Sequence, residues 1–227
     1  MIRRTGATLI ASLTLSAIAP ATAQKAATEC RLLNAHDEYR LSSLDWGPGE
    51  PAPDCASITE PSLVVFGRLG SGEFVKNRRD PQGQPTFHEP GDVLYFERGG
   101  LAESIEPSGR LLRAYVIALL GDRRTRSTAA SRYPPAFPRP DSIALLDNDR
   151  VGVWSYTIPI ESAPLRVHAG PSIYVWLSDG TIERRSANGT IREHEAKAGS
   201  SGFQGAGTVE AERAVDRPIR AVSIEIK

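Results

Sequence analysis

The stretch Ile173-Tyr-Val-Trp-Leu-Ser-Asp-Gly-Thr-Ile-Glu-Arg-Arg-Ser-Ala-Asn-Gly-Thr-Ile-Arg-Glu-His-Glu195 decides the fold. It contains three runs suited to β-strands, at 173–177, 181–185 and 190–195, separated by an Asp-Gly pair and an Asn-Gly pair. Such pairs supply the positive φ that tight hairpin turns require. The stretch therefore predicts a three-stranded antiparallel meander.

The same arrangement of residues occurs earlier in the chain, at a spacing of about 108 residues. Three pairs of segments correspond, namely 62–66 with 172–176, 88–101 with 194–209, and 113–117 with 220–224. Ser-Leu-Val-Val-Phe thus lines up with Ser-Ile-Tyr-Val-Trp, and Arg-Ala-Tyr-Val-Ile with Arg-Ala-Val-Ser-Ile. Because a fixed internal spacing is the mark of a duplicated unit, the sequence predicts two copies of one fold.

Composition narrows the class of protein. The chain has 227 residues, with 27 Lys and Arg against 27 Asp and Glu, so no basic surface that would favour nucleic acid is expected. Hydrophobic residues at 40% and charged residues at 24% are ordinary for a globular protein, while 20 Gly, 17 Pro and a single Met favour turns over long helices. We therefore expect an all-β protein without a nucleic-acid partner.

The N-terminal segment has the features of a secretory signal peptide. It carries Arg3 and Arg4, then an apolar stretch over 7–18, then Ala21-Thr-Ala23, whose small residues suit the cleavage rule. We expect cleavage after Ala23 and a periplasmic or secreted protein. No later segment approaches the 18 consecutive apolar residues of a membrane helix, so no membrane partner is expected after cleavage.

A stretch rich in Arg and Pro separates the two copies. It contains Arg-Arg-Thr-Arg and then Tyr-Pro-Pro-Ala-Phe-Pro-Arg-Pro, whose prolines prevent regular strand pairing and favour an extended connector. The predicted organisation is a signal peptide over 1–23, an N-terminal unit over 24–120, a linker over 121–140 and a C-terminal unit over 141–227.

Two cysteines, Cys30 and Cys55, remain after the predicted cleavage. Two cysteines in an oxidising compartment most often pair. A disulfide that closes a loop of about 26 residues should stabilise the fold by roughly 3.5 kcal/mol. Two free, buried thiols are the alternative.

A series of short motifs runs through the second copy. They are 145–154, 159–168, 175–180, 198–199, 205–208 and 216–227. With these motifs the region 143–227 resembles a cupin domain. The first copy, 29–120, is similar but weaker, and keeps Trp46-Gly-Pro-Gly49-Glu50 and Pro90-Gly91-Asp92. The resemblance implies a tandem cupin, or bicupin, in which two small jelly-roll barrels fill nearly the whole mature chain.

The resemblance also locates the positions where metal-binding cupins hold their ion, which are two His and a Glu in a first motif and one His in a second. His168 stands at the first position, but Gly170, then Ile173 or Tyr174, and Val209 stand at the others. The first copy retains none of these ligands. First-row divalent ions need three or four nitrogen or oxygen ligands, so we expect no metal and no other cofactor.

The remaining histidines, His36, His88 and His194, are predicted to lie on the surface. His88 and His194 occupy matching positions in the two copies, each before an expected turn, whereas His36 has no counterpart.

A ligand site is expected inside the second barrel. Strand alternation from an inward Val209 would turn Ala211 inward as well and Glu210 outward. The predicted ligand-binding residues are His168, Tyr174, Trp176 and Arg213. A buried arginine needs an anionic partner, which a carboxylate or sugar-acid ligand would provide. In the alternative, Arg213 reaches the rim and the barrel is closed by its own side chains.

Three classes of function stay open at this point. The first is a non-catalytic binding or regulatory module for a small polar or anionic ligand, with no catalytic residue. The second is a metal-dependent cupin enzyme of the dioxygenase or isomerase type that uses unusual ligands. The third is a structural protein whose barrels form a homodimer.

Overall fold

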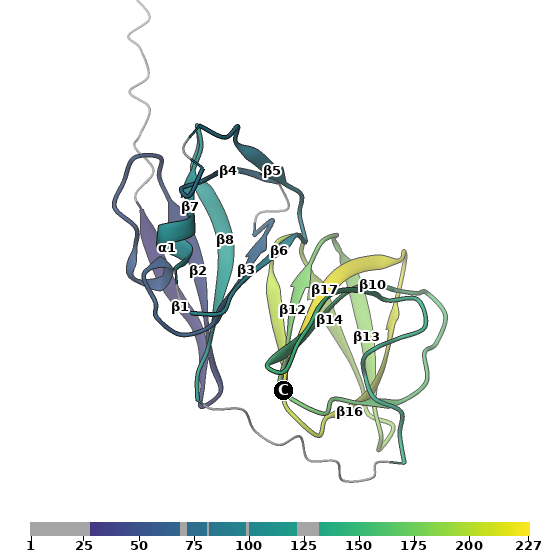
Figure 1. Cartoon of the computed structure of the whole chain (residues 1–227). Coiled ribbons are helices and arrows are strands. Elements are labelled where there is room, and N and C mark those ends of the chain that lie inside the picture. Colours follow the sequence, from purple (N-terminus) through teal and green to yellow (C-terminus); the bar gives the residue numbers. More distant parts are fainter. Residues whose placement is uncertain (1–27, 69–71, 81, 99, 122–131) are drawn as a thin grey trace, which may run out of the picture.

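The computed structural model describes residues 28–68, 72–80, 82–98, 100–121 and 132–227. The predicted signal peptide and the Arg-rich part of the predicted linker lie outside these residues. The described chain consists almost entirely of antiparallel strands, which confirms the predicted all-β fold (Figure 1). None of its described helices is both long and apolar enough to cross a membrane.

The first unit, residues 28–121, consists of two sheets that face each other. The larger sheet has the order β1-β2-β8-β3-β6, with β1 Glu29–His36, β2 Tyr39–Trp46, β3 Ser62–Phe66, β6 Val93–Phe96 and β8 Leu112–Leu119. The smaller sheet has the order β5-β4-β7, with β4 Glu73–Asn77, β5 Thr86–His88 and β7 Ile105–Pro107. Two short helices, η1 Asp54–Ala56 and α1 Leu101–Ser104, lie in the connections.

The second unit, residues 132–227, has the same plan. Its larger sheet has the order β15-β12-β17-β10-β9, with β9 Ile143–Asp147, β10 Val151–Ile158, β12 Ser172–Trp176, β15 Ser201–Gln204 and β17 Ile219–Ile226. Its smaller sheet has the order β11-β16-β13-β14, with β11 Arg166–Val167, β13 Gly180–Ser186, β14 Ile191–Ala196 and β16 Val209–Ala214. Each strand of the first unit has a counterpart here, and β11 is the one addition among the described strands. The internal repeat is therefore visible in the topology.

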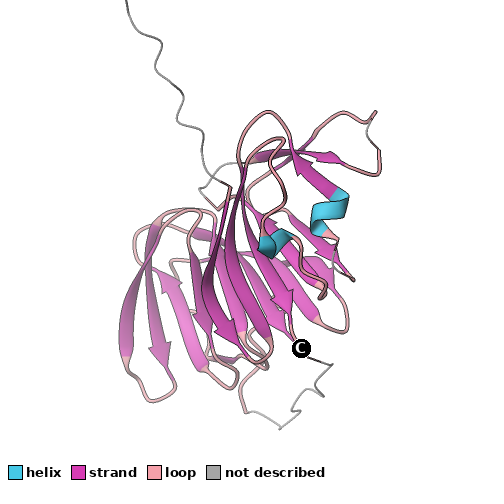
Figure 2. Ribbon diagram, turned by 90° about the vertical axis from the view of Figure 1, so that its left-hand side faces the viewer, coloured by secondary structure: helices cyan, strands magenta, loops and turns pink. Residues whose placement is uncertain are grey.

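The two larger sheets pack against each other. Strand β8 directs Ala114 and Val116 into the core of the first unit and Tyr115 and Ile117 toward the second. One apolar cluster joins the two units, and its buried members are Tyr39, Leu41, Leu63, Val65, Tyr115, Ile117, Leu119, Val151, Val153, Ile173, Val175, Val222, Ile224 and Ile226. Figure 2 shows the strands of both units stacked in successive layers. We call the apolar cluster that joins the two units the shared core.

The two units are also joined by a buried hydrogen bond. The Tyr115 hydroxyl donates to the Gly199 carbonyl over 2.9 Å. The turn at Gly199 is in turn bonded to β12, because the Gly199 N–H donates to the Trp176 carbonyl over 2.7 Å. Tyr115 of the first unit therefore contacts a turn of the second unit that is itself bonded to β12.

The structure corrects the predicted meander. Strands β13 and β14 do form a hairpin around Asn188-Gly189, where Gly189 has φ +85°. Strand β12, however, pairs with β15 and β17 in the other sheet. The Ser178-Asp179-Gly180 segment is therefore a corner between two sheets, because the apolar residues of β12 are buried on both faces and need neighbours there.

The predicted linker is also corrected at its C-terminal end. Ala136 and Phe137 are buried in the core of the second unit, and the Phe137 ring stacks on Trp154 with centroids 5.2 Å apart. The prolines do prevent regular pairing, but Pro135 still forms a bridge with Val167. Residues 132–140 therefore belong to the second unit.

In the first unit, Cys30 and Cys55 form the predicted disulfide between β1 and η1.

Candidate functional site

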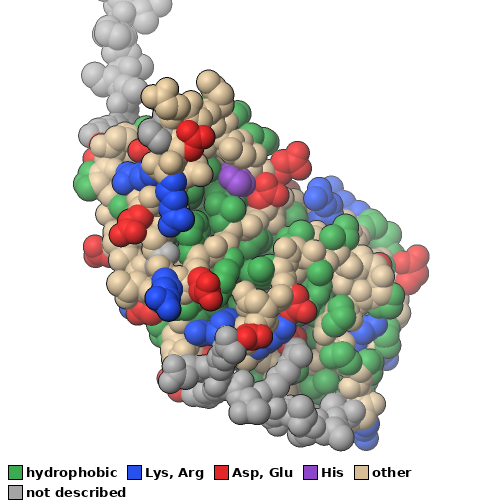
Figure 3. Space-filling view, viewed as in Figure 1, with side chains coloured by type: hydrophobic (Ala, Val, Ile, Leu, Met, Phe, Trp, Pro, Cys, Tyr) green, Lys and Arg blue, Asp and Glu red, His purple; other side chains and the backbone are tan. Residues whose placement is uncertain are grey.

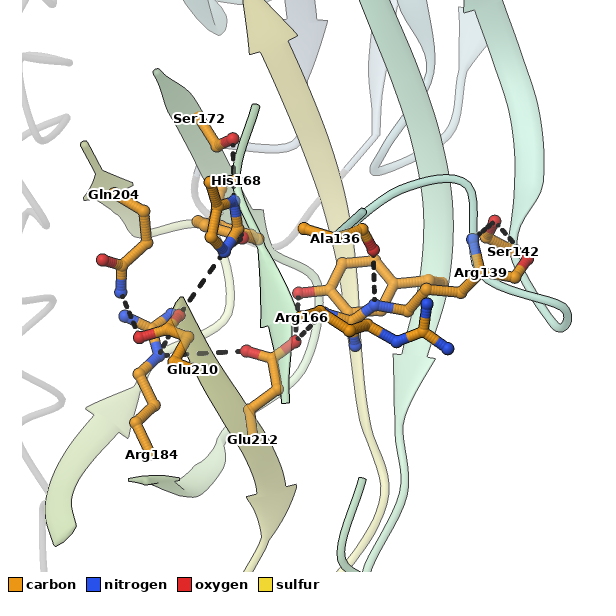
Figure 4. A network of polar contacts seen from close by, with 12 residues as sticks. Ala136, Arg139, Ser142, Arg166, His168, Ser172, Arg184, Gln204, Glu210 and Glu212 are labelled. Carbon is orange, nitrogen blue, oxygen red and sulfur yellow. Dashed lines mark hydrogen bonds and ion pairs between the residues drawn. The ribbon is translucent and has the colours of Figure 1, made fainter. Parts of the chain in front are cut away.

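A group of polar side chains lies between the two sheets of the second unit (Figure 4). Its members come from two loops and from the strands β12, β13, β15 and β16, and they are Arg139, His168, Ser172, Arg184, Gln204, Glu210 and Glu212. We call this group the polar network. Charged side chains in a protein interior are costly unless they are paired, so the partners of each charge decide whether the network is stable.

The face that β16 turns toward the interior determines which side chains form the site. Glu212 lies opposite Arg184 on β13, and Glu210 lies opposite Ser186. Because side chains alternate along a strand, both glutamates face the interior. The expectation that Val209 and Arg213 face the interior is therefore wrong, because the inward-facing side chains of β16 are shifted by one residue.

Arg213 consequently lies outside the polar network. It forms a two-pronged ion pair with Glu183 across the outer face of the smaller sheet, with Nε to Oε1 at 2.8 Å and Nη2 to Oε2 at 2.6 Å. This partner on the neighbouring strand satisfies the charge that was expected to require a ligand.

Glu212 forms the centre of the network. Its Oε1 lies 2.6 Å from Arg139 Nη2 and accepts a hydrogen bond from the Tyr156 hydroxyl over 3.3 Å, while its Oε2 lies 3.8 Å from Arg184 Nε. Burial alone would raise the pKa of the Glu212 carboxyl, but Arg139 and Arg184 outweigh burial and hold that pKa below its ordinary value. Glu212 is therefore ionised at neutral pH.

Glu210 lies close to both Arg184 and His168. Gln204 donates to Glu210 Oε2 over 3.1 Å, and Glu210 Oε1 lies 3.7 Å from both Arg184 Nε and His168 Nε2. His168 itself is buried, with Nδ1 3.1 Å from the Ser172 hydroxyl and Nε2 3.3 Å from the Tyr174 hydroxyl. The imidazole is thus held on both sides.

Arg184 has unused hydrogen-bonding capacity. Its guanidinium lies over the rings of Tyr174 and Trp176, 5.5 and 5.8 Å from their centroids. Within the described residues its Nε and Nη2 atoms donate no hydrogen bond, and Glu210 Oε1 and Glu212 Oε2 accept none. Burial lowers the pKa of Arg184, but the two glutamates outweigh burial and raise it. Fixed donors and acceptors therefore face one another here without direct bonds.

A cavity of about 480 Å³ leads from Arg184 and Glu210 to solvent. We call it the second cavity. Its outer wall comes from the β13–β14 hairpin, including Asn188, Arg192 and His194. His194 is exposed, as predicted, and lines the mouth of this cavity. Partial burial and the charge of Arg184 lower the pKa of its imidazole.

The residues present do not fit a metal ion. Among the described residues no three His, Cys, Asp or Glu side chains lie close enough together to hold one. Gly170 could not be replaced by a ligand without a backbone shift, because a Cβ there would lie 2.0 Å from the Ile226 carbonyl oxygen. The positive Arg184 also occupies the interior where a cation would have to sit. The unusual-ligand metal site is not supported by these donors.

The structure brings together three of the four predicted ligand-binding residues, His168, Tyr174 and Trp176. Sequence reasoning missed Arg139, Arg184 and both glutamates. The Glu-x-Glu spacing of β16 was the available signal, since it places two carboxylates on one face of a strand. No pattern in the sequence identifies Arg139 as their partner.

The sequence matches no family model and no curated protein. Solved structures that resemble nearly the whole chain include the following three. A cupin 2 conserved barrel domain protein from Leptotrichia buccalis has a TM-score of 0.56 at 14% identity, over 91% of this chain and 92% of its own. The E. coli protein Ylba gives 0.54 at 13%, over 87% and 82%, and AerE from Microcystis aeruginosa gives 0.53 at 10%, over 87% and 91%. At these identities the likeness concerns the fold alone, and it confirms the cupin fold expected from the motifs.

Proposed function

We propose that this tandem cupin-fold protein is a binding module whose second unit accepts a small, neutral, polyhydroxylated ligand. The observation that carries the proposal is the facing pair formed by Arg184 and Glu210 at the inner end of the second cavity. Arg184 Nε and Nη2 and Glu210 Oε1 are buried without a hydrogen-bond partner in the described part of the chain, and both residues line this cavity. Buried polar groups without hydrogen bonds are costly, so a ligand that completes them is bound favourably.

A hydroxyl group fits this pair better than a carboxylate does. One hydroxyl can accept from Arg184 and donate to Glu210, because it is both donor and acceptor. A carboxylate could only accept, and Glu210 and Glu212 would repel it. Arg139 and Arg184 already balance these two glutamates. The proposal therefore favours a neutral ligand over the sugar acid that was expected from Arg213.

Binding is a better match for the network than acid–base catalysis. A general acid or base works best when its pKa lies near the working pH. The arginines lower the pKa of Glu212, and the glutamates raise that of Arg184, so both charges are fixed near neutral pH. A cavity of about 480 Å³ is also within the range of small-ligand sites.

We further propose that the protein acts in the periplasm or outside the cell. The predicted signal peptide and the Cys30–Cys55 disulfide support this location. Free sugars or polyols from the surroundings would then reach the second cavity directly.

A melting screen of the mature chain against sugars, polyols and their acids tests the proposal. A neutral sugar at 100 times its dissociation constant should stabilise the protein by about 2.7 kcal/mol. Calorimetric titration should then show affinity lost about ten-fold or more in Arg184→Met and in Glu210→Gln. Arg213→Met, on the outer face, is the matched control and should bind as the parent does.

EDTA should leave the affinity unchanged, since no metal is involved. If only acids bind, or if Arg184→Met binds as tightly as the parent, the proposal is wrong. Binding that EDTA abolishes would instead favour the metal-dependent alternative.

A further inference from the structure

The first unit contains a cavity at the place that corresponds to the second cavity. It has a volume of about 620 Å³ and is lined from β4, β5, β6 and the α1–β7 segment, where the second cavity is lined from β13, β14, β15 and β16. These strands are counterparts in the two sheet orders. The duplicated fold therefore leaves an opening in both units, although only the second was expected to hold a ligand. We call this opening the first cavity.

Strand register identifies the matching residues of the two cavities. Asn77 lies opposite Ile105 as Ser186 lies opposite Glu210. By the same pairing, Val75 stands where the second unit has Arg184. Ser62 lies opposite Phe96 as Ser172 lies opposite Gln204, which makes Phe96 the counterpart of Gln204.

Each charged or amide side chain at the inner end of the second cavity is thus apolar in the first. Val75, Ile105 and Phe96 replace Arg184, Glu210 and Gln204, and Leu94 adds to the same wall. In Figure 3 hydrophobic side chains gather in the recess of the first unit, with charged side chains around it. Contact between such a wall and an apolar molecule is favourable, because it removes apolar surface from water.

Two arginines give the first cavity a positive edge. Arg79 and Arg98 both line it, and neither forms an ion pair with any residue in the described part of the chain. The neighbouring Arg78 differs, because it pairs with Glu106 at 3.5 Å and lies over the Trp46 ring. Glu97 also lines the cavity, so the three charged residues sum to one positive charge.

His88 closes one side of the first cavity as His194 does in the second. Its ring stacks on Phe66 with centroids 4.3 Å apart, and its Nδ1 lies 3.4 Å from Asp92. The imidazole is therefore fixed in place at the wall of the first cavity.

We propose that the first cavity binds a small amphipathic anion, with its apolar body against Val75, Phe96 and Ile105 and its acidic group at Arg79 and Arg98. This site and this ligand class are separate from the polyhydroxylated ligand of the second unit. One chain then carries two sites of opposite polarity.

The fluorescent anion 1-anilinonaphthalene-8-sulfonate is a suitable probe, with the uncharged N-phenyl-1-naphthylamine as its neutral counterpart. Both are titrated into the folded mature chain with direct excitation of the probe. We expect saturable binding of the anion to one site. Thr86→Trp, which fills the cavity from its exposed edge, should abolish that binding, and Arg110→Gln, away from the cavity, should leave it unchanged.

The double variant R79Q/R98Q separates charge from shape. It should weaken the anionic probe about ten-fold or more and leave the neutral probe unaffected. Thermal melting of each variant verifies that it is folded. Unchanged binding in a folded Thr86→Trp protein would overturn the site, and equal losses for both probes in R79Q/R98Q would overturn the anionic class.

Discussion

Glu210 and Ile105 occupy the same register position in the two halves of one chain, each opposite the last residue of the neighbouring strand, Ser186 and Asn77. The backbone pairing around them is the same, yet one side chain is a carboxylate and the other a branched alkane. Backbone hydrogen bonds keep the fold, and they do not depend on which side chain faces the interior. The two interiors can therefore differ in polarity without a change in topology.

The buried pair Arg139–Glu212 should be important for stability. Its atoms lie 2.6 Å apart, and the side chains are 9% and 3% exposed. Removing one partner leaves a buried charge with less compensation, so Arg139→Met should cost about 3 kcal/mol or more in the free energy of unfolding. Urea denaturation measures this loss. Arg213→Met, which breaks a pair on the outer face, should hardly move the midpoint, and equal effects of both variants would contradict the assignment.

Stability should fall in acid through Glu212. Its pKa in the folded protein lies below the ordinary value near 4.5, so its charge stabilises the fold above that pH and the contribution is lost as the pH falls through the folded value. Glu212→Gln cannot titrate. The stability gap between parent and variant, measured by urea melts from pH 7 to pH 3, should be widest at pH 7 and should narrow on acidification. A gap that stays constant with pH would rule out this role.

Cleavage between the copies should not separate them. Trypsin should cut in the Arg-rich stretch between the units and give two fragments of similar size on a denaturing gel. Because residues of both units are buried in the shared core, the nicked protein should still elute from gel filtration as one particle. Ile117→Asp, which places a charge in that core, should release or aggregate the fragments. Separate elution of the parent fragments would show that the shared core does not hold the units together.

The disulfide should be complete in the mature protein. Under denaturing, non-reducing conditions a thiol reagent should label no cysteine, and two labelled sites per chain would refute the pairing. The double variant C30S/C55S should lose about 3.5 kcal/mol in the free energy of unfolding, because the unfolded chain is no longer restricted by the bond across 25 residues.

Local patterns were sufficient for the repeat, the all-β class and the Asn188-Gly189 hairpin, because these depend on alternation and on turn residues. Local patterns were insufficient to predict which face of β16 is buried. Each of its alternating faces carries charge, and which face is buried depends on partners elsewhere. Glu212 can be buried because Arg139, more than 70 residues earlier in the sequence, lies beside it.

The predicted linker shows the same dependence on tertiary partners. A Pro-rich segment does favour an irregular backbone, and residues 132–140 are largely irregular. Yet Phe137 is 1% exposed, because its ring fits between Trp154 and Tyr156 of β10. Composition describes the backbone of such a segment and does not reveal which of its side chains is inserted into a core.

The shared core also has a consequence for stoichiometry. If one such unit formed a homodimer through the same sheet face, its two interiors would be identical, and any substitution would alter both at once. Joining two copies in one polypeptide removes that constraint, so Arg184 and Val75 can differ at equivalent positions. The covalent link also fixes the ratio of a polar to an apolar compartment at one to one in every molecule.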